Sequence, residues 1–106
     1  RPLSVDWVRP PRVEADGIFG SVRAWNSSTA DLDLTLIVVA VNEYGKAFTL
    51  GYQRFLLARW NTTVEIPFGF TLPRGHYTAH VDAVGEVAPR NAIFRARRQL
   101  GPLRVD

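Results

Sequence analysis

Apolar and polar residues alternate along most of this chain, which is the pattern of strands that bury one face. The clearest example runs from His76 to Val84. Its inward positions are predicted to be Tyr77, Ala79, Val81 and Ala83. Its outward positions are predicted to be His76, Thr78, His80 and Asp82. Helical periodicity is almost absent, so the pattern predicts an all-β protein.

Turn-forming residues divide the alternation into about seven strands. The predicted strands are Leu3–Val8, Ile18–Asn26, Leu32–Asn42, Ala47–Trp60 (one bent strand or two short ones), Val64–Phe70, His76–Val84 and Ala92–Gln99, with Leu103–Val105 closing the chain. The strongest hairpin turn lies between the third and fourth of these, where Gly45 can adopt positive φ. Ala47–Trp60 has a bulge predicted at Gly51 and, as an alternative, one helical turn over Phe55–Arg59.

Prolines and double-sided apolar stretches predict where these strands lie in their sheets. Pro10-Pro11 indicates an edge strand or a strand that switches sheets, and Pro67 indicates a second edge or a bulge. The strand Leu32–Asn42 is apolar on both faces through its second half, so it is central or its outer face meets a partner. Residues 85–91 are expected to form a loop, and Gly101-Pro102 is expected to end the last long strand.

The run from Val64 to Asp82 resembles the late strand pair of bacterial and archaeal CARDB-like and fibronectin type III-like modules. In this chain, as in those modules, an apolar strand passes through a Leu-Pro-Gly turn into a Gly-x-Tyr segment with alternating small apolar residues. The resemblance implies a tyrosine corner made by Leu72, Gly75 and Tyr77, with the ring in the core and the hydroxyl bonded to turn backbone. Together with the strand spacing, it indicates one antiparallel immunoglobulin-like β-sandwich domain over residues 1–106.

Composition narrows the class of protein. The 106 residues are 46% hydrophobic and 22% charged, which is ordinary for one globular domain. There is no cysteine, so neither disulfides nor thiolate metal sites contribute. No apolar run is long enough to span a membrane. The chain begins with Arg1 and contains no methionine, which indicates a processed product or a piece of a longer protein.

Candidate chemistry is sparse, and we expect no enzyme activity and no cofactor. His76, His80 and Asp82 share a strand face and could suggest a metal, but residues four apart on a strand lie about 13 Å apart. A solvated polar face is the favoured interpretation. Asp31 and Asp33 flank a loop and are interpreted as turn formers. The Asn-x-Ser/Thr patterns at Asn26 and Asn61 fit glycosylation acceptors, but turns are favoured.

Basic and aromatic residues provide the remaining candidates. The net charge is +3, and 12 of the 13 basic residues are arginine. Arginine is densest near the C-terminus, where a possible basic interaction surface consists of Arg90, Arg95, Arg97 and Arg98. A solvated edge strand protected by charge is the favoured alternative, and nucleic acid is an unlikely ligand. The tryptophans are expected to fill the core, with a sugar-stacking platform made by Trp7, Trp25, Trp60, Tyr44 and Tyr52 as the alternative.

The leading functional hypothesis is a non-catalytic interaction or spacer module of a bacterial secreted or cell-surface protein. The resemblance implies this class of role. Its partner would be a protein or a second copy, bound by a strand edge or the end loops, without membrane insertion. A structural decoration or tail domain of a phage or virus, located in the virion, is the first alternative. A carbohydrate-associated accessory domain that binds glycan is the second.

Overall fold

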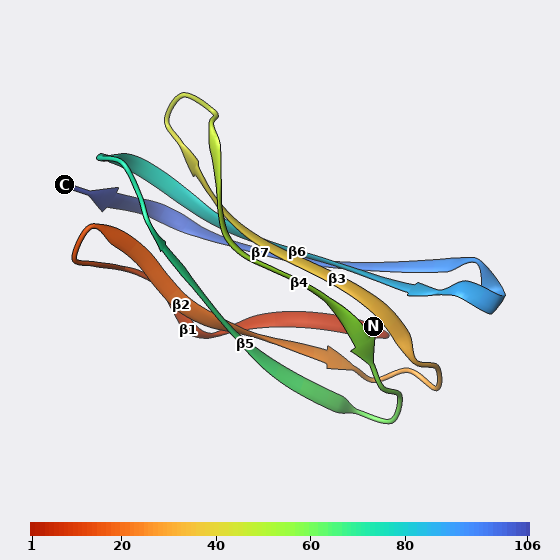
Figure 1. Ribbon diagram of the computed structural model, residues 1–106. Helices are drawn as coiled ribbons and strands as arrows, with labels where there is room; N and C mark the ends of the chain where they lie inside the picture. The colour runs from red at the N-terminus through yellow and green to blue at the C-terminus, as the bar shows by residue number, and fades with distance from the viewer.

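The computed structural model describes residues 1–106, apart from the side chain of Ala88. It contains seven strands and one short 3-10 turn (Figure 1). These are β1 (Leu3–Glu14), β2 (Gly17–Asn26), β3 (Leu32–Asn42), β4 (Ala47–Leu57), β5 (Thr62–Thr71), β6 (Gly75–Val87), the 3-10 turn η1 (Ala88–Arg90) and β7 (Ala92–Val105). Every strand pair is antiparallel. The prediction of an all-β antiparallel protein of about seven strands is confirmed.

The strands form two sheets that pack face to face. One sheet has the order β1-β2-β5, and the other has the order β4-β3-β6-β7. Figure 1 shows the two layers crossing along a molecule that measures 46 × 23 × 19 Å. The architecture is an immunoglobulin-like β-sandwich, with β1 and β5 at the edges of one sheet and β4 and β7 at the edges of the other.

Alternation decides which side chains enter the space between the sheets. The inward face of β3 is entirely buried, and it consists of Leu32, Leu34, Leu36, Val38 and Ala40. The predicted inward set of β6 is buried as well, and it consists of Tyr77, Ala79, Val81 and Ala83. Because burial of an aliphatic side chain contributes about 1.5–3 kcal/mol, these two central strands supply much of the folding free energy.

Prolines occupy the edges, as predicted. Pro10 and Pro11 lie in edge strand β1, at a point where its pairing with β2 shifts register between Arg9 and Arg12. Pro67 lies in edge strand β5. A residue without an N–H group is tolerated there because one side of an edge strand has no ladder partner. The prediction that the first strand stops at Val8 is wrong, since the bulged strand continues to Glu14.

Three further boundaries differ from the predictions: β6 and β7 extend beyond their predicted ends, whereas β4 ends at Leu57 and not at Trp60. Residues 55–57 belong to β4, not to a helical turn, and Leu57 is buried in the core. Strand β6 runs through to Val87, so the expected loop is reduced to η1 and Asn91. Strand β7 passes Gly101-Pro102 with a register shift and ends at the buried Val105. In each case the strand ends at an inward-facing apolar residue.

Candidate functional site

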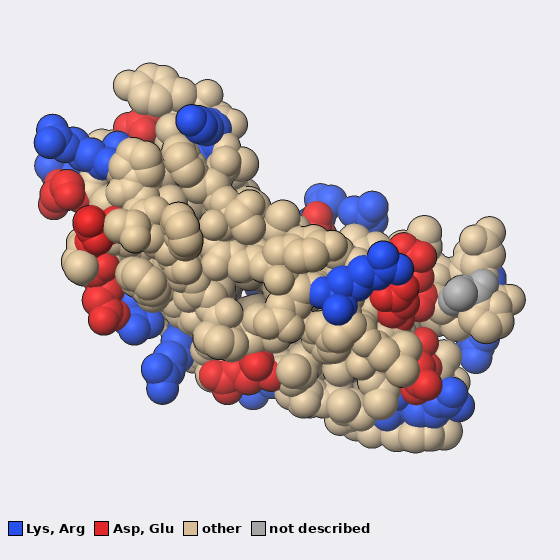
Figure 2. Space-filling model, viewed as in Figure 1, with Lys and Arg blue, Asp and Glu red and all other residues tan. Residues whose placement is uncertain are grey.

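The predicted basic residues lie together along one margin of the four-stranded sheet. Arg95, Arg97 and Arg98 belong to β7, and Arg90 lies in η1 at the turn from β6 to β7. All four are exposed. Lysine, arginine and acidic side chains are mixed on the face seen in Figure 2, with no basic patch of this kind. We call residues 93–99 of β7 the basic edge.

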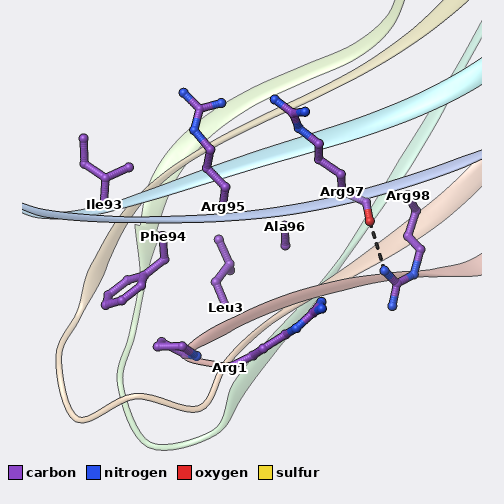
Figure 3. Close-up of a pocket in the computed structure, with 9 residues that line it drawn as sticks. Arg1, Leu3, Ile93, Phe94, Arg95, Ala96, Arg97 and Arg98 are labelled. Atoms are coloured by element: carbon purple, nitrogen blue, oxygen red, sulfur yellow. Dashed lines mark hydrogen bonds between the residues drawn. The ribbon is translucent and has the colours of Figure 1, made fainter.

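At every second residue of the basic edge, the backbone N–H and C=O groups point away from the sheet. β7 pairs with β6 alone, and Arg97 lies opposite Asp82. The Arg97 carbonyl accepts a hydrogen bond from Nη1 of Arg98 at 3.0 Å (Figure 3). In an antiparallel pair, residues alternate between bonding the neighbouring strand and pointing outward. The outward orientation at Arg97 therefore extends to Ile93, Arg95 and Gln99.

The arginines of the basic edge make only weak internal pairs. Arg97 Nε lies 3.3 Å from Oδ1 of Asp82, and Arg98 Nε lies 3.9 Å from Oδ1 of Asp6. No carboxylate among the described side chains pairs with Arg95. Exposed ion pairs contribute little to stability, so these guanidinium groups can exchange to another anion at small cost.

A shallow concavity of about 680 Å³ lies beside the basic edge. Figure 3 shows Phe94, Ala96 and Arg98 pointing from β7 toward the start of β1, where Arg1 and Leu3 lie. Arg95 and Arg97 point to the opposite side of the strand (Figure 3). The concavity thus combines an apolar floor with an arginine rim. The sequence pattern did not identify Arg1 and Leu3 as part of this region, since nothing local indicates that β1 and β7 meet.

The outer face of the four-stranded sheet carries a second hollow, of about 760 Å³. Ile37 and Val39 of the central strand β3 are only half-buried there, beside His80 of β6 and Gln99 of β7. The double-sided apolar pattern of β3 therefore has two causes. Its inner face belongs to the core, and its outer face contributes apolar surface at the middle of the sheet.

The remaining polar candidates are used in local pairs. His76 Nδ1 lies 3.1 Å from Glu43 Oε2, and this hydrogen bond is the main cause that lowers the pKa of Glu43. Arg59 binds Asp31, and Arg54 binds Asp33 through two hydrogen bonds of 3.1 and 2.7 Å. Within the described part of the chain, no three His, Asp or Glu side chains gather in a group that could hold a metal.

Tyr77 joins the core to the turn that precedes β6. Its ring is buried, and its hydroxyl donates a hydrogen bond of 2.6 Å to the Pro73 carbonyl. Burial, and then the negative charge of Glu43, raise the pKa of Tyr77. Leu72 is buried at the same turn, and a Cβ at Gly75 would lie 3.5 Å from the Tyr77 ring. We propose that these residues form a purely structural corner.

Two tryptophans contradict the expectation of core filling. Trp25 is 44% exposed and Trp60 is 68% exposed, whereas Trp7 packs edge-on against Phe68. Trp25 lies outside because it shares the outward face of β2 with Arg23. Its indole N–H donates to Asn61 Oδ1 at 3.2 Å.

Asn26 is a structural residue of the loop between β2 and β3. Its side chain is completely buried, and Nδ2 donates to the carbonyls of Ala30, Leu57 and Ala58. Oδ1 accepts hydrogen bonds from the backbone N–H and the hydroxyl of Ser28. These bonds hold the turn that the sequence predicts for the Asn-Ser-Ser segment. Because the amide is buried, it is not accessible for glycosylation in the folded state.

Comparisons with known proteins support the fold. No model of a known protein family matches the sequence, and no curated protein matches it. A beta-glucuronidase from glycoside hydrolase family 2 matches 95% of this chain, with 12% identity and a TM-score of 0.56. The sporulation control protein Spo0M from Bacillus subtilis matches 100%, with 15% identity and a TM-score of 0.52. A glycosyl hydrolase family 2 member from Bacteroides cellulosilyticus matches 94%, with 14% identity and a TM-score of 0.55.

These similarities concern only parts of larger proteins. The chain covers 13%, 51% and 14% of the lengths of the three matched proteins, respectively. At such low identity the likeness shows a shared immunoglobulin-like sandwich and nothing about activity. Separately, the described residues include no helix with the length and apolar character to cross a bilayer.

Proposed function

We propose that this chain is a non-catalytic, fibronectin type III-like interaction module of a bacterial secreted or cell-surface protein, and that the basic edge is its working surface. The observation that carries the proposal is the combination, on one exposed strand, of outward-facing backbone and three arginines. Arginine suits recognition of carboxylates on a protein partner because its planar fork can bind them through two hydrogen bonds.

The use of the other polar side chains supports a binding role over a catalytic one. Groups of catalytic type form exposed pairs with each other, as His76 does with Glu43 and Asp33 does with Arg54. Such pairs stabilise hairpins and strand registers. A rigid sandwich with a charged, accessible edge is suited to hold a partner and to present it to neighbouring domains.

A binding screen with matched variants tests this proposal. The chain is applied to arrays of peptides, glycans and single-stranded oligonucleotides, alongside the double variants Arg95→Glu/Arg97→Glu and Lys46→Glu/Arg74→Glu. Both double variants change the net charge equally, but Lys46 and Arg74 are exposed turn residues outside β7. We expect peptide ligands that bind the wild type and the control but not the β7 variant. Peptide binding that survives in the β7 variant would refute the proposed surface, and an absence of peptide ligands would refute the protein-binding role.

The exposed tryptophans favour one second candidate, a carbohydrate-associated accessory domain. Trp25 borders a concavity of about 320 Å³ with Arg23, Asn61 and Thr63, and its hydrogen bond to Asn61 holds the ring in place. Sugar rings stack on exposed aromatic faces of this kind. Glycan binding that is lost in Trp25→Ala but retained in Tyr44→Ala, whose side chain is exposed at another turn, would support it over the protein-binding role.

The hollow around Ile37 and Val39 supports the virion alternative only if it mediates self-association. Analytical ultracentrifugation of the wild type and of Ile37→Glu tests this. A stable oligomer that the substitution dissociates would favour a structural assembly role. A monomer would favour the interaction module.

A further inference from the structure

We infer that the partner bound by the basic edge is an extended acidic segment that adds to the sheet as a fifth strand beside β7. The inference depends on the proposed function for its location, and it specifies the chemistry of the partner. In such strand addition, backbone hydrogen bonds supply affinity, and alternate side chains supply specificity.

The four edge strands differ in how well they could accept another strand. β1 contains two prolines and two register shifts, and β5 contains Pro67. In β4 a bulge at Leu50 divides the strand, and its regular part is Gly51–Leu57. β7 keeps an unbroken register with β6 from Ala92 to Leu100, and its bulge lies beyond that run. Strand β5 keeps its register from Thr62 to Thr71, but Pro67 removes one N–H donor from the middle of that edge. The run Ala92–Leu100, which contains the basic edge, is therefore the longest edge without a proline or a bulge that a new strand could pair with.

The outward-facing backbone groups define the contact. Ile93, Arg95, Arg97 and Gln99 would each offer one N–H and one C=O, over roughly 20 Å of strand. At present Arg98 satisfies the Arg97 carbonyl by its side chain. A partner N–H can replace that bond, since a guanidinium near the surface is readily solvated.

Charge determines which strand can bind. Partner residues opposite Arg95 and Arg97 would share their face of the sheet, and cross-strand pairs are favourable when the charges are opposite. Partner side chains at the intervening positions would face Leu3, Phe94 and Ala96, which line the concavity. The expected partner segment alternates acidic and apolar residues. A second copy of β7 is disfavoured, because arginine would then lie opposite arginine.

Short synthetic peptides test the inference directly by fluorescence anisotropy. The first alternates glutamate and valine. The second, a block peptide, has the same composition but carries all its glutamates before its valines. The third is the alternating peptide with an N-methyl group on every second amide. It is made in two forms, which carry the N-methyl groups on opposite sets of alternate amides. We expect the alternating peptide to bind at least about tenfold more tightly than the second peptide and than one of the two N-methylated forms. The weaker peptides lose several backbone hydrogen bonds to β7, each worth about 1 kcal/mol. Binding should also fall at least about tenfold in Arg95→Glu/Arg97→Glu and persist in Lys46→Glu/Arg74→Glu.

The outcomes separate this inference from the proposed function. Equal binding of the alternating and block peptides, or insensitivity to N-methylation in both forms, would mean that the basic edge recognises charge alone. Strand addition would then be wrong, while a protein-binding basic edge would stand. Tighter binding of a single-stranded oligonucleotide or a sulfated oligosaccharide than of any peptide would overturn both. Circular dichroism melts of each variant establish that it is folded before binding is compared.

Discussion

Removal of one hydroxyl group should measure how strongly the turn before β6 is held. In Tyr77→Phe the ring stays in the core, and only the 2.6 Å hydrogen bond to the Pro73 carbonyl is lost. A hydrogen bond contributes about 0.5–1.5 kcal/mol net, and a partly buried carbonyl left without its donor adds to the loss. We therefore expect a loss of about 1–2 kcal/mol. In a chain of this size, each kcal/mol lowers Tm by roughly 4–8 °C.

The matched control is Tyr52→Phe. Tyr52 is 59% exposed, and no described residue forms a hydrogen bond with its hydroxyl, so its free energy of unfolding should change by less than about 0.5 kcal/mol. Urea unfolding followed by tryptophan fluorescence measures both variants. If Tyr77→Phe is as stable as the control, the hydroxyl does not hold the corner, and the structural role proposed for Leu72, Gly75 and Tyr77 would be refuted.

The same variant predicts a change at alkaline pH. Burial and the charge of Glu43 raise the pKa of Tyr77 above its usual value of 10.0, so the folded state holds this proton more tightly than the unfolded state. The contribution of the protonated Tyr77 hydroxyl to the free energy of unfolding is complete below about pH 10. It decreases as the pH rises through the folded-state pKa. The stability of Tyr77→Phe should fall less steeply over this range than that of the wild type. Parallel alkaline profiles would contradict the assignment.

Three further substitutions test the sandwich itself. Asn26→Ala removes a buried amide whose Nδ2 donates to the carbonyls of Ala30, Leu57 and Ala58, of which, among the described residues, only Ala30 keeps another side-chain donor, the Ser28 hydroxyl. The substitution should cost about 3 kcal/mol in urea unfolding, whereas near-normal stability would contradict its structural role. A Cβ at Gly69 would overlap the Phe19 ring, so Gly69→Ala should cost about 1–3 kcal/mol, and less in a Phe19→Ala background. Arg54 lowers the pKa of Asp33 from 3.8, so this pair stabilises the fold above that pH and less as the pH falls below it. Acid melts of Asp33→Asn should therefore show a weaker pH dependence than those of the wild type.

Much of the fold could be predicted from local pattern. The alternation in residues 76–84 identifies the strand and its buried face, because successive strand side chains point to opposite sides. The apolar residues on both faces of residues 32–42 identify a central strand, but they do not show which face enters the core. Pro67 likewise identifies an edge, because proline cannot donate to a ladder. These properties follow from the backbone and from neighbouring residues only.

The errors occur where partners distant in sequence decide the outcome. The Gly101-Pro102 pair predicts the end of a strand, but β7 continues past it because it pairs with β6 and because Val105 is buried. The composition predicts Trp60 to be a core residue, but it lies at the turn between β4 and β5 with positive φ and is exposed. A propensity for burial is realised only if the fold places that position between the sheets.

The basic edge shows the same division. The clustering of arginine in residues 90–98 is visible in the sequence, and it identified a possible interaction surface. Only the tertiary structure shows that β7 lies at an edge, that the Arg97 carbonyl points outward, and that Leu3 comes beside Phe94. Strand identity is a property of neighbouring residues, whereas the position of a strand in a sheet depends on pairings that span the whole chain.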